Sequence, residues 1–238
     1  MAKKPPSGRC VHCLEHSDHR TWDHVFPVSW YPDSTPQNIA KWKIPSCLKC
    51  NQEYGVLEED LLGRLALCID PQSEKNKGIV ERALRSIDPS SAKGQKDRGS
   101  RQAKRQKLQR EMLEGHAIPD HGIYPNLGER WNRPIEERAA ISVSASSISR
   151  LCEKIVRGIT YIADNRFIEH PYHVNFYALT DDGALGFEEV FEKFGQLFAR
   201  EPGIAVRRAV AHEDKISSLY SIEIFGQFKM YATVTAGG

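Results

Sequence analysis

The sequence predicts an α+β fold with a zinc-bound strand–strand–helix unit at the N-terminal side and a C-terminal α+β unit. Three observations lead to this prediction. Two cysteine pairs lie within the first 50 residues. Apolar residues then recur at helical spacing, from Leu57 to Cys68. Residues 148–238 combine amphipathic helical patterns with β-rich runs, and 238 residues suffice for one large domain or two small ones.

Residues 9–70 are predicted to form the first unit. A strand is expected over residues 21–28, and a second strand near residues 39–44 follows a loop rich in Pro, Asp and Ser. A helix is expected to start close to Cys50, because leucines recur there every three or four residues. Pro71 lies just past its end and acts as a stop signal.

Residues 71–147 are predicted to form a helical, basic connector. A short helix is expected at residues 77–87, ended by Asp88-Pro89. Residues 95–114 contain good helix formers with almost no apolar periodicity, which indicates an exposed helix or a tether.

The C-terminal unit, residues 148–238, is predicted to hold a roughly four-stranded, largely antiparallel sheet. Amphipathic helices are expected at 148–162 and 186–200, the second with an aromatic face that packs on the sheet. The expected strands are 173–179, 204–210, 219–225 and 228–234, with a hairpin turn at Gly226-Gln227.

Composition favours a cytoplasmic protein without a membrane span. No apolar run reaches the length of a spanning helix, and the first eight residues lack the apolar stretch of a secretory signal. Thiols stay reduced in the cytosol, where paired cysteines serve more often as metal ligands than as disulfides.

The cysteine pairs Cys10/Cys13 and Cys47/Cys50 indicate a four-thiolate zinc site, with a redox dithiol or chance as the alternatives. Four thiolates fill a tetrahedral ion, so this zinc is expected to be structural and coupled to local folding. Three nearby histidines could compete as ligands but are expected to be solvent-exposed loop residues: His12, His16 and His19.

A polar pattern lies between and beside the two cysteine pairs. Asp23-His24 is followed by Pro27, Asn38 comes fourteen residues after His24, and Asn51 directly follows Cys50. This arrangement resembles the HNH nucleases, also called ββα-metal or His-Me finger nucleases, and looks particularly similar to the zinc-containing endonuclease VII type. The resemblance covers about residues 9–60.

Two positions depart from the family pattern. Its frequent Gly-Gly is replaced by residues 32–36, and the lysine common after the final asparagine is Tyr54.

The resemblance implies a role for each matching residue. His24 would be the general base, because an imidazole titrates near neutral pH. Asp23 and Asn51 would hold one Mg²⁺ or Mn²⁺ ion, and Asn38 would brace the loop and help to orient His24. The implied products carry a 5′-phosphate and a 3′-hydroxyl. Successive strand residues point to opposite faces, so Asp23 and His24 can serve one centre only where the strand ends or distorts.

A basic segment at residues 93–110 stands out in a chain of net charge +2. It is expected to contact a polyanion, with a solvated helix face or a flexible linker as the alternative. The candidate DNA-contacting residues are Lys96, Arg98, Arg101, Lys104, Arg105 and Lys107.

The sequence therefore predicts a metal-dependent endonuclease acting on double-stranded DNA, with structural zinc. By analogy with nucleases that carry an accessory domain, its expected role is restriction or anti-phage defence. Two alternatives remain: a zinc-dependent nucleic-acid-binding module without catalysis, and an HNH nuclease directed at RNA. The C-terminal unit could form a homodimer, recognise DNA or restrain the nuclease.

Overall fold

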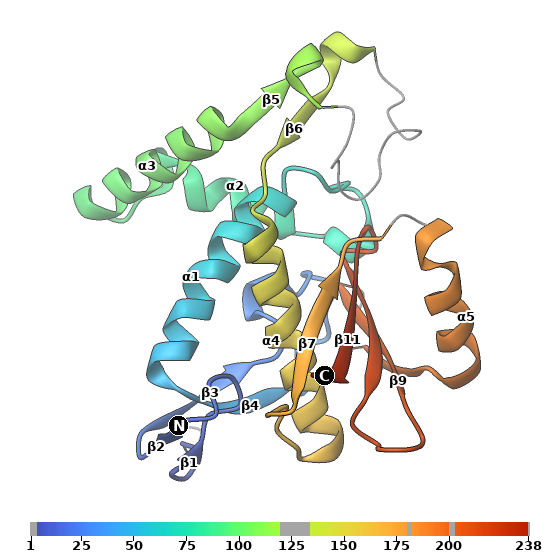
Figure 1. Ribbon diagram of the computed structural model, residues 1–238. Helices are drawn as coiled ribbons and strands as arrows, with labels where there is room; N and C mark the ends of the chain where they lie inside the picture. The colour runs from blue at the N-terminus through green and yellow to red at the C-terminus, as the bar shows by residue number, and fades with distance from the viewer. Residues whose placement is uncertain (1–3, 120–133, 180–181, 200–202, 238) are drawn as a thin grey trace.

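The computed structural model describes residues 4–119, 134–179, 182–199 and 203–237 and shows an α+β fold (Figure 1). Its N-terminal part contains two small antiparallel hairpins and one long helix. These elements are β1 (Gly8–Arg9), β2 (His16–Ser17), β3 (Arg20–His24), β4 (Lys43–Cys47) and α1 (Leu48–Leu65). The predicted strand–strand–helix order is confirmed, although both strands are shorter or shifted relative to the predicted ranges.

The middle of the chain forms two helices and a small hairpin. Helix α2 (Ile79–Ile87) ends where Asp88 begins a short turn, and α3 (Gln95–Glu111) follows. Strands β5 (Met112–Glu114) and β6 (Ala139–Ile141) pair antiparallel, so the last residues of the helix predicted at 95–114 are a strand. Residues 120–133 of the predicted connector lie outside the described residues.

The C-terminal sheet has five antiparallel strands in the order β7-β11-β10-β9-β8, one more than predicted. Its elements are α4 (Ala145–Asp164), β7 (Tyr172–Tyr177), α5 (Leu185–Phe194), β8 (Gln196–Ala199), β9 (Ile204–Val210), β10 (Ser218–Ile224) and β11 (Phe228–Ala236). The extra strand, β8, was predicted as the end of a helix.

Short 3₁₀ turns join several of these elements. They lie at Val28–Trp30, Glu74–Asn76, Pro89–Ser91, Gly115–Ala117, Ile135–Glu137 and Asp182–Ala184. Among the residues that the structure describes, none of the helices combines the length and the hydrophobicity that crossing a bilayer requires.

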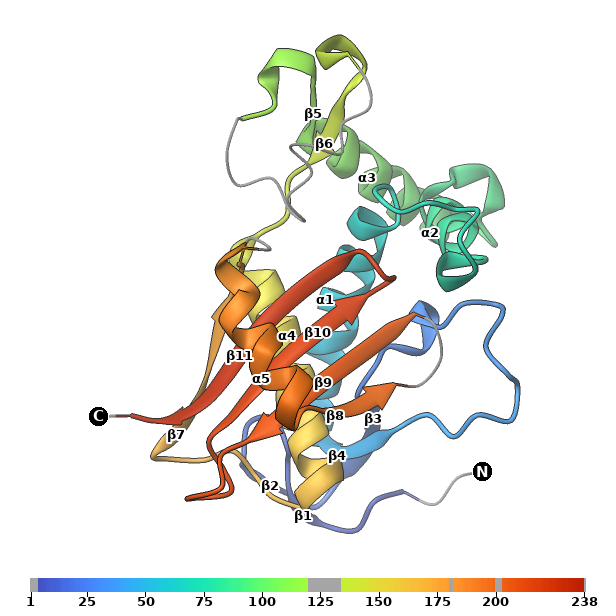
Figure 2. The same ribbon diagram turned by 90° about the vertical axis from the view of Figure 1, so that its right-hand side faces the viewer.

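The sheet is covered by helices on both faces (Figure 2). Helix α5 covers one face, where Phe191 packs with Ala209 and Tyr231. Helix α4 lies on the other face, between the sheet and α1 (Figures 1 and 2).

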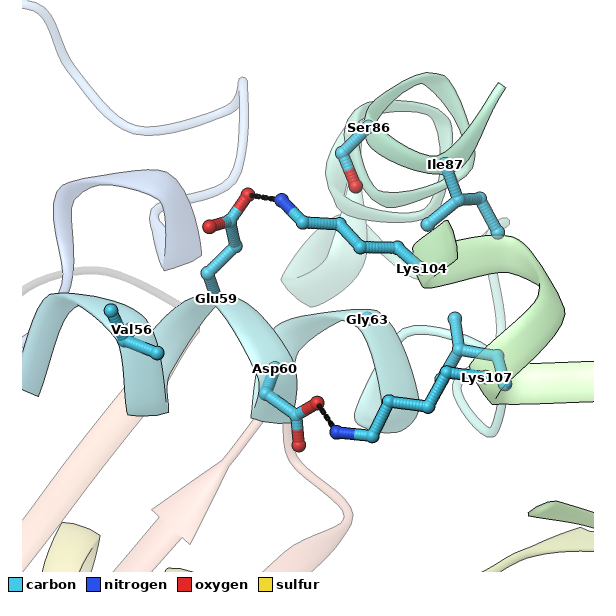
Figure 3. A pocket seen from close by; sticks show the side chains of 9 residues that line it. Val56, Glu59, Asp60, Gly63, Ser86, Ile87, Lys104 and Lys107 are labelled. Atoms are coloured by element: carbon cyan, nitrogen blue, oxygen red, sulfur yellow. Dashed lines mark hydrogen bonds and ion pairs between the residues drawn. The ribbon is translucent and has the colours of Figure 1, made fainter. Parts of the chain in front are cut away.

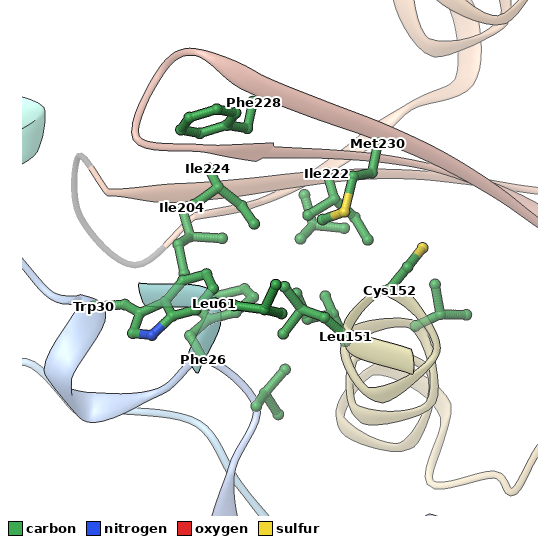
Figure 4. Close-up of a cluster of buried hydrophobic side chains, with 14 of the residues drawn as sticks. Phe26, Trp30, Leu61, Leu151, Cys152, Ile204, Ile222, Ile224, Phe228 and Met230 are labelled. Carbon is green, nitrogen blue, oxygen red and sulfur yellow. The ribbon is translucent and has the colours of Figure 1, made fainter. Parts of the chain in front are cut away.

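One buried hydrophobic cluster extends from the N-terminal part to the sheet. Figure 4 shows Phe26 and Trp30 facing Ile204 of β9, with Leu151 of α4 beside them. The predicted division at residues 70 and 147 stays a prediction, and the core runs across both positions.

Helix α4 approaches the end of β3 closely through Gly158. A Cβ atom at this position would lie 2.9 Å from both methyl carbons of Val25, the residue after His24. Gly158 therefore allows α4 to pack closely against Val25, the residue that follows the candidate catalytic pair Asp23-His24 in the chain.

Candidate functional site

The four cysteine sulfurs converge into one cluster, consistent with a zinc site. The Sγ atoms of Cys10, Cys13, Cys47 and Cys50 all lie within 4.8 Å of one another, and those of Cys13 and Cys47 are 3.9 Å apart. A tetrahedral zinc with Zn–S bonds of about 2.3 Å places its sulfurs about 3.8 Å apart. These four residues, called the four-cysteine cluster below, therefore have the donor set and the spacing that fit a structural Zn²⁺ ion.

Backbone amides around the four-cysteine cluster prepare it for an ion. The His12 N–H points at the Sγ of Cys10 and the Cys50 N–H at the Sγ of Cys47, each at 3.4 Å. Burial raises the pKa of the Cys10 thiol, but hydrogen bonds from the backbone of Cys13, Cys47 and His12 outweigh it and bring that pKa to about 7. Since the thiolate is the metal-binding form, the surroundings of Cys10 favour metal binding, whereas burial raises the pKa values of Cys13 and Cys50.

Asp23 belongs to a buried ion cluster formed with His12, Glu58 and Lys154. The Asp23 residue is only 5% exposed. One of its carboxylate oxygens accepts a hydrogen bond from His12 Nε2 at 2.8 Å, and the other accepts from Lys154 Nζ at 3.0 Å. Lys154 Nζ also donates to the Glu58 carboxylate, and the Lys154 side chain is completely buried. The buried ion cluster thus links four parts of the chain: the turn between β1 and β2, strand β3, helix α1 and helix α4.

The buried ion cluster shifts the pKa values of three of its groups. Burial would raise the pKa of Asp23, but the His12 hydrogen bond and the Lys154 charge lower it below its usual value. Burial raises the pKa of Glu58 to about 7, although Lys154 opposes this shift. Burial lowers the pKa of His12 despite its bond to Asp23, so its imidazole is neutral at neutral pH.

His24 is the last residue of β3, and Lys43 is its partner across the hairpin. Burial lowers the pKa of His24, and Lys43 lowers it further, against the effect of Asp23. The imidazole is therefore neutral at neutral pH, as a general base must be. Asp23 still pairs in register with Ile44, so regular alternation directs the Asp23 and His24 side chains to opposite faces of the hairpin.

Asn51 lies beside β3, as the cysteine spacing predicts. Its Nδ2 donates to Thr21 Oγ1 at 2.8 Å and more weakly to the Trp22 carbonyl at 3.4 Å, which ties the start of α1 to the strand. Asn38 is exposed in the loop before β4. Within the described part of the chain, no hydrogen bond joins Asn38 to His24. The predicted bracing role of Asn38 stays a prediction.

A divalent ion at Asp23 does not fit this arrangement. Both carboxylate oxygens of Asp23 already bind protein groups, and the Lys154 ammonium occupies the position that a cation would take. Asn51 presents its amide nitrogen to β3, which makes it a donor rather than a ligand there.

The basic residues of α3 divide into two groups. Lys104 pairs with Glu59 and Lys107 with Asp60, so both dock α3 on α1 around a small cavity of about 230 Å³ (Figure 3). Arg101 pairs with Asp97 on its own helix. The remaining candidates are exposed: Lys96, Arg98 and Arg105.

Sequence reasoning missed three members of the buried ion cluster. His12 was predicted to be exposed, which is wrong: the residue is 7% exposed and its ring lies 4.6 Å from that of Tyr54. His16 and His19 are exposed as predicted. Lys154 carries a detectable anomaly, because it falls between Leu151 and Ile155 on the apolar stripe of α4, where a charge needs a buried partner.

The chain matches no known protein-family model, and neither curated proteins nor solved structures give a match. The likeness to HNH nucleases therefore rests on the residue pattern alone.

Proposed function

We propose that the chain is a zinc-stabilised, metal-dependent endonuclease that hydrolyses phosphodiester bonds in DNA. The observation that carries the proposal is His24: a half-buried imidazole with a lowered pKa at the end of β3, the strand that pairs with the β4 segment ending at Cys47 of the four-cysteine cluster. A neutral imidazole with a free lone pair is the group that can take a proton from water.

In this proposal His24 removes a proton from the water molecule whose oxygen attacks phosphorus. The bond to the 3′ oxygen breaks, and the products carry a 5′-phosphate and a 3′-hydroxyl. Lys43 lies across the hairpin from His24, and Lys41 also contributes positive potential there, which favours a phosphate on this face.

The proposal includes one Mg²⁺ or Mn²⁺ ion with Asp23 and Asn51 as ligands, which would stabilise negative charge at the phosphate. That ion requires Asp23 to exchange its present partners, because His12 and Lys154 hold both carboxylate oxygens. It also requires the Asn51 amide to turn its oxygen toward the ion, because its Nδ2 now donates to Thr21.

The test is a plasmid-nicking assay on the zinc-loaded chain with Mg²⁺ or Mn²⁺, run for the wild type and for Lys154→Met. His24→Ala is expected to abolish cleavage, while the matched control His19→Ala, an exposed histidine on the same segment, keeps it. Intact plasmid with both the wild type and Lys154→Met, or cleavage that survives His24→Ala, would overturn the proposal. A parallel digest of RNA separates a DNA enzyme from an RNA enzyme, and sequencing of the cut ends tests the 5′-phosphate.

A second candidate is a zinc-dependent nucleic-acid-binding module without catalysis. The burial of Asp23 under α4 favours it, since a carboxylate neutralised by lysine has no need of a divalent ion. It predicts that the double variant Asp23→Asn/His24→Ala, if folded, binds DNA as the wild type does and that no variant cleaves it.

A further inference from the structure

The buried carboxylate of Asp23 and the partly buried carboxylate of Glu58 converge on a single ammonium at the junction of α1, β3 and α4. Lys154 Nζ lies 3.0 Å from Asp23 Oδ1 and donates to Glu58 in addition. We propose that Lys154 is the resident cation of this Asp23–Glu58 pair and that it excludes a divalent ion until α4 withdraws. The regulatory part of this inference rests on the proposed function, whereas the exclusion of the ion does not.

The Asp23–Glu58 pair has the chemistry of a hard-cation site. Carboxylate oxygens are the ligands that Mg²⁺ and Mn²⁺ prefer, and a divalent ion would balance both negative charges where an ammonium balances one. Burial raises the pKa of Glu58 to about 7 even beside Lys154, so the single ammonium does not keep this carboxylate fully ionised at neutral pH. An ammonium and a metal ion cannot occupy the same point between these oxygens.

Lys154 differs from Arg208, another buried cation among the described residues of the C-terminal part. Arg208 is 2% exposed and pairs with Asp164, a residue of the same part of the chain and the last residue of α4. Lys154 instead reaches 131 residues back along the chain to Asp23 and 96 residues back to Glu58. It therefore links the state of the carboxylate pair to the position of α4.

Withdrawal of Lys154 would involve the C-terminal sheet. Leu151, Cys152 and Ile155 surround Lys154 on α4 and are fully buried in the shared core against the sheet (Figure 4). On the other side, Gly158 holds α4 in contact with Val25. A shift of α4 would thus move Lys154 away from Asp23 and loosen the backbone beside His24, which couples metal entry to the arrangement of the sheet.

The experiment is a Mn²⁺ titration of the zinc-loaded full chain, followed by the electron paramagnetic resonance signal of free Mn²⁺. The variants are Lys154→Met, which keeps an unbranched side chain one atom shorter and without the charge, and Lys154→Met/Asp23→Asn. Arg208→Met is the matched control, because it also removes a buried cation but leaves Asp23 and Glu58 untouched. Zinc content and thermal melting verify that each variant is folded.

We expect Lys154→Met to bind one Mn²⁺ about tenfold or more tightly than the wild type, a difference of about 1.4 kcal/mol. The added Asp23→Asn change should remove this gain, and Arg208→Met should bind as the wild type does. Equal Mn²⁺ affinity in the wild type and Lys154→Met would overturn the inference.

A measurement on the wild type alone keeps the inference testable if Lys154→Met does not fold. Fe²⁺ with ascorbate generates hydroxyl radicals that cut the backbone beside a bound metal, and mass spectrometry maps the cuts. We expect no cuts around Asp23 and Glu58; cuts there would overturn the exclusion of the ion. If His24→Ala abolishes nicking while Lys154→Met neither gains Mn²⁺ nor accelerates nicking, the proposed function stands and the inference fails.

Discussion

The N-terminal part contains two cation-binding places that differ in chemistry and in origin. The four-cysteine cluster offers soft ligands from two short segments, and Cys13 in it is exposed. The Asp23–Glu58 pair offers hard ligands, is largely shielded from solvent, and holds a fully buried lysine from the C-terminal part. The four-cysteine cluster follows from the spacing of residues along the chain. The Asp23–Glu58 pair is enclosed by the packing of α4, a helix distant in sequence, and Lys154 of that helix lies between the two carboxylates.

Of the changes predicted below for these two sites, removal of zinc should cause the largest loss of folding free energy. Structural zinc in small fingers contributes about 10–16 kcal/mol of apparent binding free energy, which is also folding free energy. Cys47→Ser, or a strong chelator, should therefore unfold the β1–β2 turn and free the start of α1, where Cys47 is the N-cap. Hydrogen exchange measures this loss of protection, and elemental analysis should find about one zinc per chain.

Cys68→Ala is the matched control for the zinc experiment, since its thiol is free and lies outside the four-cysteine cluster. It should keep zinc and protection. Unchanged exchange in zinc-free protein would contradict a structural role for the ion.

Breaking the buried ion cluster should have the next largest effect. Asp23→Asn leaves Lys154 buried with Glu58 as its remaining carboxylate, and losing one partner of a buried pair costs about 3–5 kcal/mol. Urea unfolding should show a loss near the lower end of that range, because Glu58 still pairs with Lys154. Combined with Lys154→Met, the loss should be smaller than the sum of the two single changes.

Glu59→Gln is the control for that comparison, because Glu59 is a half-exposed residue of α1 that pairs with Lys104 at the surface. It should cost less than about 1 kcal/mol. Strictly additive losses for Asp23→Asn and Lys154→Met would show that the two side chains do not interact.

The contrast between the two sites explains how much the sequence predicted. The spacing of the cysteine pairs alone predicts the four-cysteine cluster. Asn51, which directly follows Cys50, lies beside β3 as that spacing also predicts. Lys154 could not be assigned to Asp23, since no local pattern shows which helix covers a carboxylate from 131 residues away. His12 was misassigned because a histidine in a polar turn is ordinarily exposed, and tertiary burial overrides that tendency.

The sheet shows the same limit at strand β8. Residues 186–200 carry helical spacing of aromatic residues, but the helix ends at Phe194 and its C-cap is Gly195. Beyond it Phe198 is buried while Leu197 is 63% exposed, an alternation over too few residues to compete with the helical pattern. In contrast, β9 has the predicted bounds, because the β-branched residues Ile204, Val206 and Val210 recur at even spacing directly after Gly203.

The pH dependence of Glu58 should give an effect of intermediate size. Its pKa is raised from 4.5 to about 7 in the folded protein. The folded protein therefore binds a proton at Glu58 more tightly than the unfolded chain does, and this proton binding stabilises the fold. This contribution is complete below the unfolded pKa and is lost as pH rises through about 7. Between pH 5 and pH 8 the unfolding free energy should fall by about 2 kcal/mol, and Glu58→Gln should remove most of that dependence.

Glu59→Gln again serves as the neighbouring control and should keep the slope. The lowered pKa of Asp23 acts in the opposite sense, since its contribution is lost only as pH falls below its unfolded value near 3.8. The two residues therefore act in separate pH windows. A flat stability profile between pH 5 and pH 8 would contradict a buried, protonated Glu58.

The two groups of basic residues on α3 should give the smallest effects on stability and separate on DNA. Lys104→Ala/Lys107→Ala removes two surface ion pairs with α1 and should cost less than about 1 kcal/mol per pair. Arg98→Ala/Arg105→Ala changes exposed side chains of the same helix and should leave stability unchanged. If α3 contacts DNA, as its basic sequence predicts, the arginine variant should lower the slope of log affinity against log salt by about 2. This is one unit per lost phosphate contact, because each contact releases about one counterion. The lysine variant should change that slope much less, since Glu59 and Asp60 already neutralise its ammonium groups. Equal slopes for both variants and the wild type would assign α3 to docking on α1 rather than to DNA.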